Sequence, residues 1–143
     1  MHYNLANLLA ALAIMAVLSI SLAPLAAGTH DALALERAGQ QLAQDLFSLR
    51  QQAVAENRSY YVYFEWASKS YVIKEANIFS PMRRIYLPPE MEWYGPFNET
   101  IEFSNTGEVN QFGTITIHDP QSGRTFKVII ASFSGRIRIE RGG

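Results

Sequence analysis

The sequence predicts an α+β fold in which one long N-terminal helix packs on antiparallel β-sheet. Three observations predict it. The first thirty residues contain no Asp, Glu, Lys or Arg, and residues 8–27 are almost wholly apolar. Apolar residues then recur at helical spacing as far as residue 53. After residue 57 the hydrophobic period changes to two, which is typical of β-strands.

The apolar segment over residues 8–27 has the length of a membrane-spanning helix. At ~1.5 Å per residue it spans about 30 Å, which is the thickness of the hydrocarbon core of a bilayer. Two serines and Pro24 interrupt it. A proline is tolerated in a membrane helix, where neighbours satisfy the freed carbonyl. We therefore predict a transmembrane arm over residues 1–28 and a charged, water-exposed body over residues 29–143.

A cleaved secretory signal peptide is the alternative interpretation of the same segment. Small residues at 26–28 suit a cleavage site, whereas the basic region that opens a signal peptide is represented only by His2. This alternative predicts a secreted β-rich binding module whose mature chain begins near Gly28 or Thr29. The uncleaved arm is favoured, although Thr29 and Asp31 are residues that cap a new helix, so both interpretations stay open.

The second half of the predicted helix is apolar on one face only. The residues that step by three or four along this face are Leu35, Ala38, Leu42, Leu46, Leu49 and Ala53. Phe47 and Val54 are predicted to widen this stripe, while charged residues and glutamines lie largely off it. The simplest prediction is one helix from about Asn4 to Glu56, whose second half covers the sheet.

Six or seven antiparallel strands are predicted after residue 57. They lie in residues 59–66, 69–75, 99–105, 112–118, 124–131 and 136–140, with 83–87 as a short seventh inside an otherwise irregular stretch over 77–98. Alternation predicts that the core-facing residues are Tyr60, Val62, Phe64, Trp66, Tyr71, Ile73, Ile101, Phe103, Ile115, Ile117, Phe126, Val128, Ile130, Ile137 and Ile139. Turn residues separate the strands at 67–68, 105–107, 119–123 and 134–135.

Three stretches of this sequence carry a family resemblance. "NLANLLAALAIM" resembles a start in which Phe-Thr-Leu-Ile-Glu precedes an apolar run, with Tyr3 at the Phe and Asn7 at the Glu. "LERAGQQLAQDLFSLRQQAVAENRSYYVYF" resembles a helix that runs into a first strand, and residues 101–140 resemble a strand pattern with Ser-x-x-Gly-Arg before the last strand. Together they resemble type IV pilin-like proteins, above all the minor pseudopilin H family of type II secretion and its relatives in type IV pili and competence pseudopili.

The resemblance implies a non-enzymatic, cofactor-free subunit of a pilus or pseudopilus. The resemblance also implies that the arm crosses the bacterial inner membrane once and that the body lies outside the cytoplasm. The implied partners are other pilin or pseudopilin subunits, the assembly platform and the prepilin peptidase. Pro24 falls on the pilins' helix-kinking proline. The arm residues expected to pack in the filament core are Leu8, Leu9, Leu12, Ile14, Val17, Leu18 and Leu22.

Two positions depart from the family pattern. Pilin precursors carry a basic leader that ends in Gly, whereas only Met1 and His2 precede Tyr3 here, so the leader cleavage expected between His2 and Tyr3 lacks its Gly. Asn7 stands where relatives have a Glu that pairs with a neighbouring subunit's amine. Because Asn forms no ion pair, this departure argues against the major repeating subunit more than against a pilin-like protein.

Other chemistry has little support in the sequence. There is no cysteine, and the three histidines lie far apart without metal-ligand spacing. No residues suggest the polar pocket that a membrane-anchored enzyme or sensor needs.

A basic set near the C-terminus comprises Arg124, Lys127, Arg136, Arg138 and Arg141. Basic residues of this kind can bind the phosphates of DNA. However, acidic residues lie among them, and the net charge of the whole protein is −1. We therefore favour a solubilising surface over a DNA-binding one.

Overall fold

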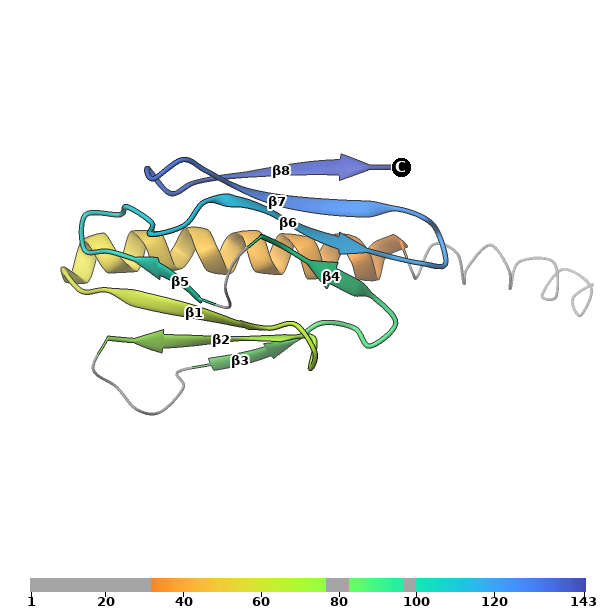
Figure 1. The fold of residues 1–143 in the computed structure, drawn as a ribbon, viewed down its shortest axis with the longest axis horizontal. Coiled ribbons are helices and arrows are strands. Elements are labelled where there is room, and N and C mark those ends of the chain that lie inside the picture. The colour runs from red at the N-terminus through yellow and green to blue at the C-terminus, as the bar shows by residue number, and fades with distance from the viewer. Residues whose placement is uncertain (1–31, 77–82, 97–99) are drawn as a thin grey trace, which may run out of the picture. The chain divides into compact units, whose positions relative to one another are not determined.

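One helix and eight β-strands make up the part of the chain that the computed structural model describes (Figure 1). The described residues are 32–76, 83–96 and 100–143, and the helix occupies 32–56. The strands are β1 (Tyr60–Glu65), β2 (Ser70–Glu75), β3 (Arg83–Tyr86), β4 (Glu92–Tyr94), β5 (Thr100–Phe103), β6 (Gly113–His118), β7 (Thr125–Ala131) and β8 (Arg136–Gly142). This confirms the predicted α+β class.

The helix buries the predicted apolar stripe and ends in a hydrogen-bonded cap. Leu42, Leu46 and Ala53 are fully buried. The chain leaves the helix through Asn57, whose φ of 54° lies in the left-handed region that asparagine tolerates. The N–H of Arg58 donates to the carbonyl of Ala53 (3.1 Å) and that of Asn57 to Val54 (3.3 Å), which is a Schellman cap.

Phe47 and Val54 do not widen the buried stripe as the sequence predicted. Their exposed fractions are 51% and 50%. Phe47 lies beside the first residues of β8, and Val54 lies beside the loop that contains Gly107, so both are at the margin of the face that the sheets cover. Helical spacing identified the buried face correctly but overestimated its width.

Sheet A has the strand order β3-β2-β1-β5 and is built around β1. In this sheet β1 pairs with both β2 and β5, and the register sets Val62 between Ile73 and Ile101. All three are buried, so one face of the sheet packs on the core. The β1–β2 hairpin turns over residues 66–69, as predicted.

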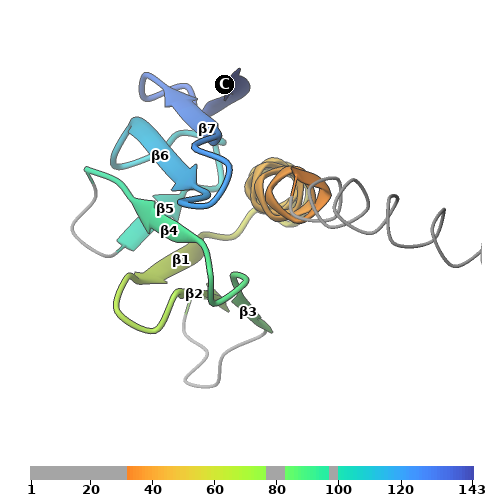
Figure 2. The same cartoon turned by 90° about the vertical axis from the view of Figure 1, so that its right-hand side faces the viewer.

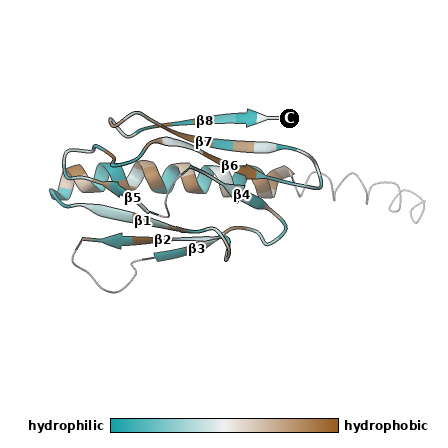
Figure 3. Ribbon diagram, in the orientation of Figure 1, coloured by the Kyte–Doolittle hydropathy of each residue, from teal (hydrophilic) through white to brown (hydrophobic). Residues whose placement is uncertain are grey.

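Sheet B has the order β4-β6-β7-β8, with β6 and β7 at its centre. The alternation predicted for β7 is confirmed, since Phe126, Val128 and Ile130 are each 1% exposed or less. The turn that joins β7 to β8 places Ser132 and Gly135 at positive φ, and glycine accepts this conformation without strain. The outermost strands β3 and β8 are largely hydrophilic, as expected for strands at sheet edges (Figure 3).

Both sheets cover the same side of the helix (Figure 2). Sheet B approaches so closely at Gly39 that a Cβ there would lie 2.1 Å from Cδ1 of Phe126. The two sheets meet through aromatic rings, because Trp93 of β4 lies 4.7 Å from Trp66 and 5.6 Å from Phe64, centroid to centroid. Residues Ala34–Gly143 thus form one compact unit with a shared core.

The prediction of six or seven strands was too low, because the described residues contain eight. The tentative strand in residues 83–87 is confirmed as β3, whereas β4 was missed. Strand β4 is three residues long, and its neighbours are prolines and glycine, so it shows no usable alternation. Strand β4 is recognised only from its pairing with β6, which sets Trp93 opposite Ile117.

The predicted arm over residues 1–28 lies outside the described residues, as does the start of the long helix. Within the described part of the chain, no helical segment is long and apolar enough to span a bilayer.

Replacing Gly39 with Ala tests the close contact between the helix and sheet B. We expect Gly39→Ala to lower the free energy of unfolding by about 1–3 kcal/mol, because the new methyl group overlaps the buried Phe126 ring. This loss outweighs the gain in helix propensity, about 1 kcal/mol. Urea unfolding followed by circular dichroism measures it. The exposed neighbour Gln40→Ala is the control, and equal stability of the two variants would contradict the contact.

Candidate functional site

A buried carboxylate connects the helix to sheet A. Asp45 is 5% exposed although it carries a charge. Its Oδ2 accepts a hydrogen bond from the Tyr71 hydroxyl (2.6 Å), its Oδ1 accepts one from Gln41 Nε2 (3.0 Å), and Arg83 forms an ion pair with it. The sequence analysis missed Asp45, but a signal was present. The residue follows Leu42 by three positions and precedes Leu49 by four, which places a charge on the apolar face.

Arg50 connects the helix to loops of both sheets. Its Nε donates to the carbonyl of Gly107 (3.0 Å), in the loop between β5 and β6, and to that of Ser134 (3.1 Å), in the β7–β8 turn. The two loops touch, since a Cβ on Gly135 would lie 2.8 Å from the Gly107 oxygen. The Val109 N–H also donates to the Phe133 carbonyl (2.9 Å). This end of the body is therefore held rigidly.

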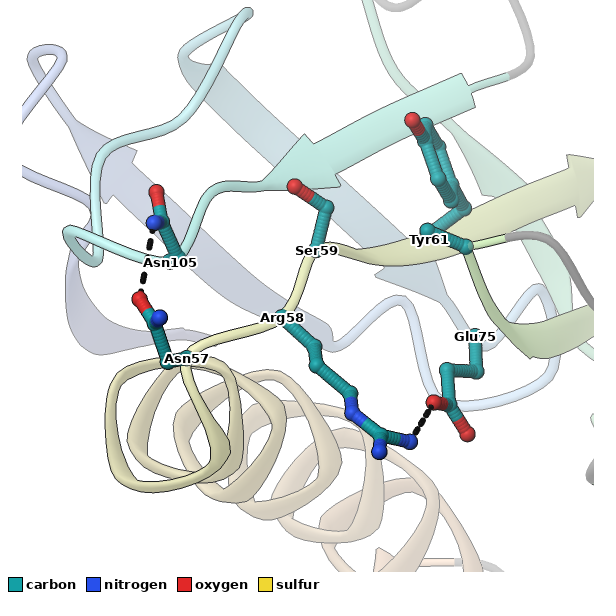
Figure 4. A pocket seen from close by; sticks show the side chains of 7 residues that line it. Asn57, Arg58, Ser59, Tyr61, Glu75 and Asn105 are labelled. Atoms are coloured by element: carbon teal, nitrogen blue, oxygen red, sulfur yellow. Dashed lines mark hydrogen bonds and ion pairs between the residues drawn. The ribbon is translucent and has the colours of Figure 1, made fainter.

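A polar recess of about 730 Å³ lies where the helix ends (Figure 4). Asn105 Nδ2 donates to Asn57 Oδ1 (2.9 Å), and Arg58 pairs with Glu75 at the opposite side. The hydrogen bond with Glu75 raises the pKa of Arg58. Ser59, Tyr61 and Ala76 complete the lining. These groups can form hydrogen bonds with a polar surface, but they include no nucleophile beside a base, so the recess suits contact rather than catalysis.

The uncovered side of the helix is a second candidate contact surface, which we call the open helix face. Its exposed residues between 38 and 55 are Gln40, Gln41, Gln44, Phe47, Ser48, Gln51, Val54 and Ala55. None of them is charged, whereas a helix face that only meets water normally carries charges. Leu33, which is also half-exposed, lies on the same side fourteen residues before Phe47, and the exposed Arg37 marks the point where charge enters this side of the helix. Such a face can be covered by another protein without burying an unpaired charge.

The predicted basic set does not form one patch. Lys127, Arg136 and Arg138 share the outer face of sheet B, where the register sets Lys127 opposite Glu140. Arg141 points to the other face and binds Glu36 of the helix through two nitrogens, with Nε 2.8 Å from Oε1. Its hydrogen bond lowers the pKa of Glu36.

The remaining polar candidates serve local structure. Asp119 accepts hydrogen bonds from the Gln121 N–H (3.0 Å) and the Ser122 hydroxyl (2.6 Å), and the bond from Ser122 lowers its pKa. It therefore stabilises the turn before β7. Glu90 and Glu92 are both exposed beside the buried Met91. Within the described ranges, no three His, Asp or Glu residues are grouped as metal ligands.

The site residues predicted in the arm are not among the described residues. These are His2, Tyr3, Asn7 and Pro24, together with the packing residues from Leu8 to Leu22. Their roles stay predictions.

The geometry described above defines a class of fold. A single helix that buries one face against antiparallel sheets and leaves the other uncovered is the architecture of a pilin-like α+β body. This confirms, at the level of the fold, the family resemblance predicted from the sequence. No protein-family model and no curated protein sequence matches the chain.

The particular structures that share this fold are minor subunits. The minor pseudopilin EpsH of the Vibrio cholerae type 2 secretion system superposes with a TM-score of 0.62 at 13% identity, over 74% of this chain and 95% of that chain. The type IV minor pilin FimU of Pseudomonas aeruginosa superposes with a TM-score of 0.57 at 21% identity, over 74% of this chain and 92% of that chain. The fold is thus that of minor pseudopilins and minor pilins.

Removal of the Asp45 carboxylate tests whether it joins the helix to sheet A. We expect Asp45→Ala to lower the free energy of unfolding by about 2–3 kcal/mol, because it leaves the buried Tyr71 hydroxyl without its acceptor and Arg83 without its partner. Asp45→Asn retains an acceptor oxygen and should lose less. Glu90→Gln, which alters an exposed carboxylate outside the four ion pairs of the described residues, is the control and should change little. If Asp45→Ala unfolds at the same urea concentration as that control, the network has no structural role.

Alkaline titration tests the junction between the helix end and β1. Burial, followed by the hydrogen bond to Glu56, raises the pKa of Tyr60 to about 12. Because this pKa is raised on folding, the stability from neutral Tyr60 is complete below pH 10 and is lost as the pH rises through about 12. Tyrosinate absorbance should therefore show a late-ionising tyrosine that Tyr60→Phe removes. Ionisation of every tyrosine near pH 10 in the still-folded protein would refute this.

Proposed function

We propose that this protein is a non-enzymatic minor pilin or pseudopilin subunit, which assembles through its N-terminal helix into a type IV pilus-like filament or a type II secretion pseudopilus. The observation that carries the proposal is the fold of the body, which matches minor subunits of both kinds of assembly over 74% of the chain. The fold alone favours neither machine over the other.

The open helix face supports an assembly role. Sheets cover one side of the helix, and the other side presents uncharged glutamines with Phe47 and Val54 half-exposed. Neighbouring subunits that cover this face would bury apolar area, which favours association at roughly 25 cal/mol per Å². Gln side chains retain hydrogen-bonding partners in such an interface more easily than charges do.

The proposed arm over residues 1–28 supplies the membrane anchor and the filament core. Side chains such as Leu12 and Leu18 are buried equally well in lipid or against other arms, so the arm can pass from the membrane into a filament. The kink at Pro24 lets the arm leave the body, residues 29–143, at an angle. Asn7 cannot form the ion pair that the Glu of relatives forms with the amine of a neighbouring subunit. The subunit is therefore suited to a filament tip, where no subunit precedes it.

The proposed location is the bacterial inner membrane, with a single pass and the body outside the cytoplasm. The proposed partners are other pilin or pseudopilin subunits, the assembly platform and the prepilin peptidase. DNA is not proposed as a partner, because Glu140 opposes Lys127 on the outer face of sheet B and Arg141 is paired with the helix.

The N-terminal sequence and intact mass of the native protein, isolated from membranes, test this function against its alternative. A start at Tyr3, with an N-methyl group, supports processing as a pilin. A start near Gly28 or Thr29 would refute the proposal and support a secreted β-rich binding module with a cleaved signal peptide. A retained Met1 would leave an unprocessed anchor and argue against polymerisation.

A charge on the open helix face should block assembly without unfolding the body. We expect Phe47→Glu to reduce incorporation into filaments at least tenfold, because the carboxylate would be buried unpaired between subunits. The matched control is Tyr94→Glu, which changes an aromatic residue of similar exposure, 58%, on β4. The readout is the fraction of protein that sediments with sheared filaments, with circular dichroism to check folding. Equal incorporation of the two variants would exclude the open helix face from assembly.

A further inference from the structure

Strand β8 is the longest edge strand among the described strands. It pairs with β7 alone among the described strands, and its seven residues exceed the four, three and four of the other edge strands β3, β4 and β5. An edge strand presents a row of N–H and C=O groups that can pair with another chain. The charged side chains of β8 oppose unspecific pairing, so a strand added to this edge has to match their charges.

An open groove runs between this edge and the helix. It has a volume of about 470 Å³ and is lined by Phe47 and Arg50 of the helix and by residues 134–137 of the turn and strand. Ile139, further along β8, is 39% exposed, so the prediction that it lies in the core was wrong. Apolar side chains from an added strand would therefore find apolar neighbours on the inner side of the edge.

The outer side of the same edge carries Arg136 and Arg138 in its first half and Glu140 further along, opposite Lys127. Arg136 lies opposite Ala131 and Arg138 opposite Ile129, so neither has an acid across the ladder. The ion pairs of the described residues involve four other arginines, and neither of these two. A strand paired with β8 would place its own outward side chains beside Arg136 and Arg138, where acids are favoured.

We propose that β8 binds an extended segment of a partner protein by strand addition, and that acidic residues alternate with apolar ones in that segment. Its backbone pairs with the free edge of β8. Its apolar side chains enter the groove beside Phe47 and Ile137, and its carboxylates meet Arg136 and Arg138. This is the pattern by which strand-adding peptides gain affinity from the backbone and specificity from alternate side chains.

The far end of β8 limits the length of the contact. Arg141 points inward, where its guanidinium lies over the Phe126 ring and binds Glu36. An inward-pointing charge on an edge strand opposes the addition of another strand. The contact is thus confined to Arg136–Glu140, next to the groove.

A second copy of this chain is a poorer occupant. Antiparallel pairing of two β8 strands about Ile139 would set Arg138 opposite Glu140, so the charges permit it. However, β8 runs opposite to the helix (Figure 1), and the pairing would point the two helices in opposite directions. That register would also leave Arg136 opposite Gly142, without an acid, and would set Ile137 opposite the inward-pointing Arg141. A second copy therefore fits this edge less well than an acidic segment does.

The test uses the full chain in detergent micelles and three labelled seven-residue peptides. In the first peptide Glu alternates with Val, in the second Lys replaces Glu, and the third is a scrambled version of the first. Fluorescence anisotropy should show that the Glu-Val peptide binds at least about threefold more tightly than either control. Its binding should weaken with added salt, and amide exchange should slow in β8 but not in β3.

Two double variants separate the site from general electrostatics. Arg136→Ser with Arg138→Ser should weaken binding of the Glu-Val peptide at least about threefold. Arg37→Ser with Arg124→Ser removes the same charge elsewhere on the exposed surface and should leave binding unchanged. Phe47→Ala should also weaken binding, because it removes one wall of the groove.

Several results would overturn the proposal. These are equal binding of the Glu-Val and Lys-Val peptides, slowed exchange at another edge, or an unchanged affinity in the Arg136 and Arg138 variant. Tighter binding of a single-stranded oligonucleotide than of the peptide at this edge would assign the arginines to nucleic acid. Dimers through β8 in sedimentation would assign the edge to a second copy. Each of these leaves the N-terminal test of the pilin function unaffected, so the two proposals can fail separately.

Discussion

One-sided burial of a single amphipathic helix is the constraint on which the rest of the structure depends. Two four-stranded sheets together cover the leucine stripe of the helix. Because the cover lies on one side, the opposite side of the helix remains bare. The same constraint explains the absence of a side chain at Gly39, where sheet B comes closest, and the buried Asp45, which joins the helix to sheet A.

The open helix face and the edge strands are the parts of this fold that partners can reach. The open helix face is uncharged, which suits a surface covered by neighbouring subunits, and β8 offers backbone groups and two unpaired arginines beside a groove. These surfaces differ in chemistry. The first favours burial of apolar area, and the second favours backbone pairing with a strand of opposite charge. Phe47 belongs to both surfaces, because it also lines the groove beside β8.

The polar contacts hold these surfaces in place. Arg50 donates to carbonyl groups from loops of both sheets, and the close approach of Gly135 to Gly107 leaves those loops little freedom. The β7–β8 turn is therefore fixed relative to the helix, which keeps the groove open. A rigid groove favours binding because little conformational entropy is lost when a partner settles in it.

Alternation and helical spacing in the sequence determined by themselves the α+β class, the end of the helix at Glu56 and most core positions, since periods of 3.6 and two report which side is buried. The pilin-like family was indicated separately, by the resemblance of three stretches of the sequence. Only the tertiary structure decided that Phe47 and Val54 stay exposed and that the three residues of β4 form a strand. It also decided that Arg141 points away from the other basic residues and binds Glu36. These features depend on contacts between segments distant in the chain, which local periodicity does not encode.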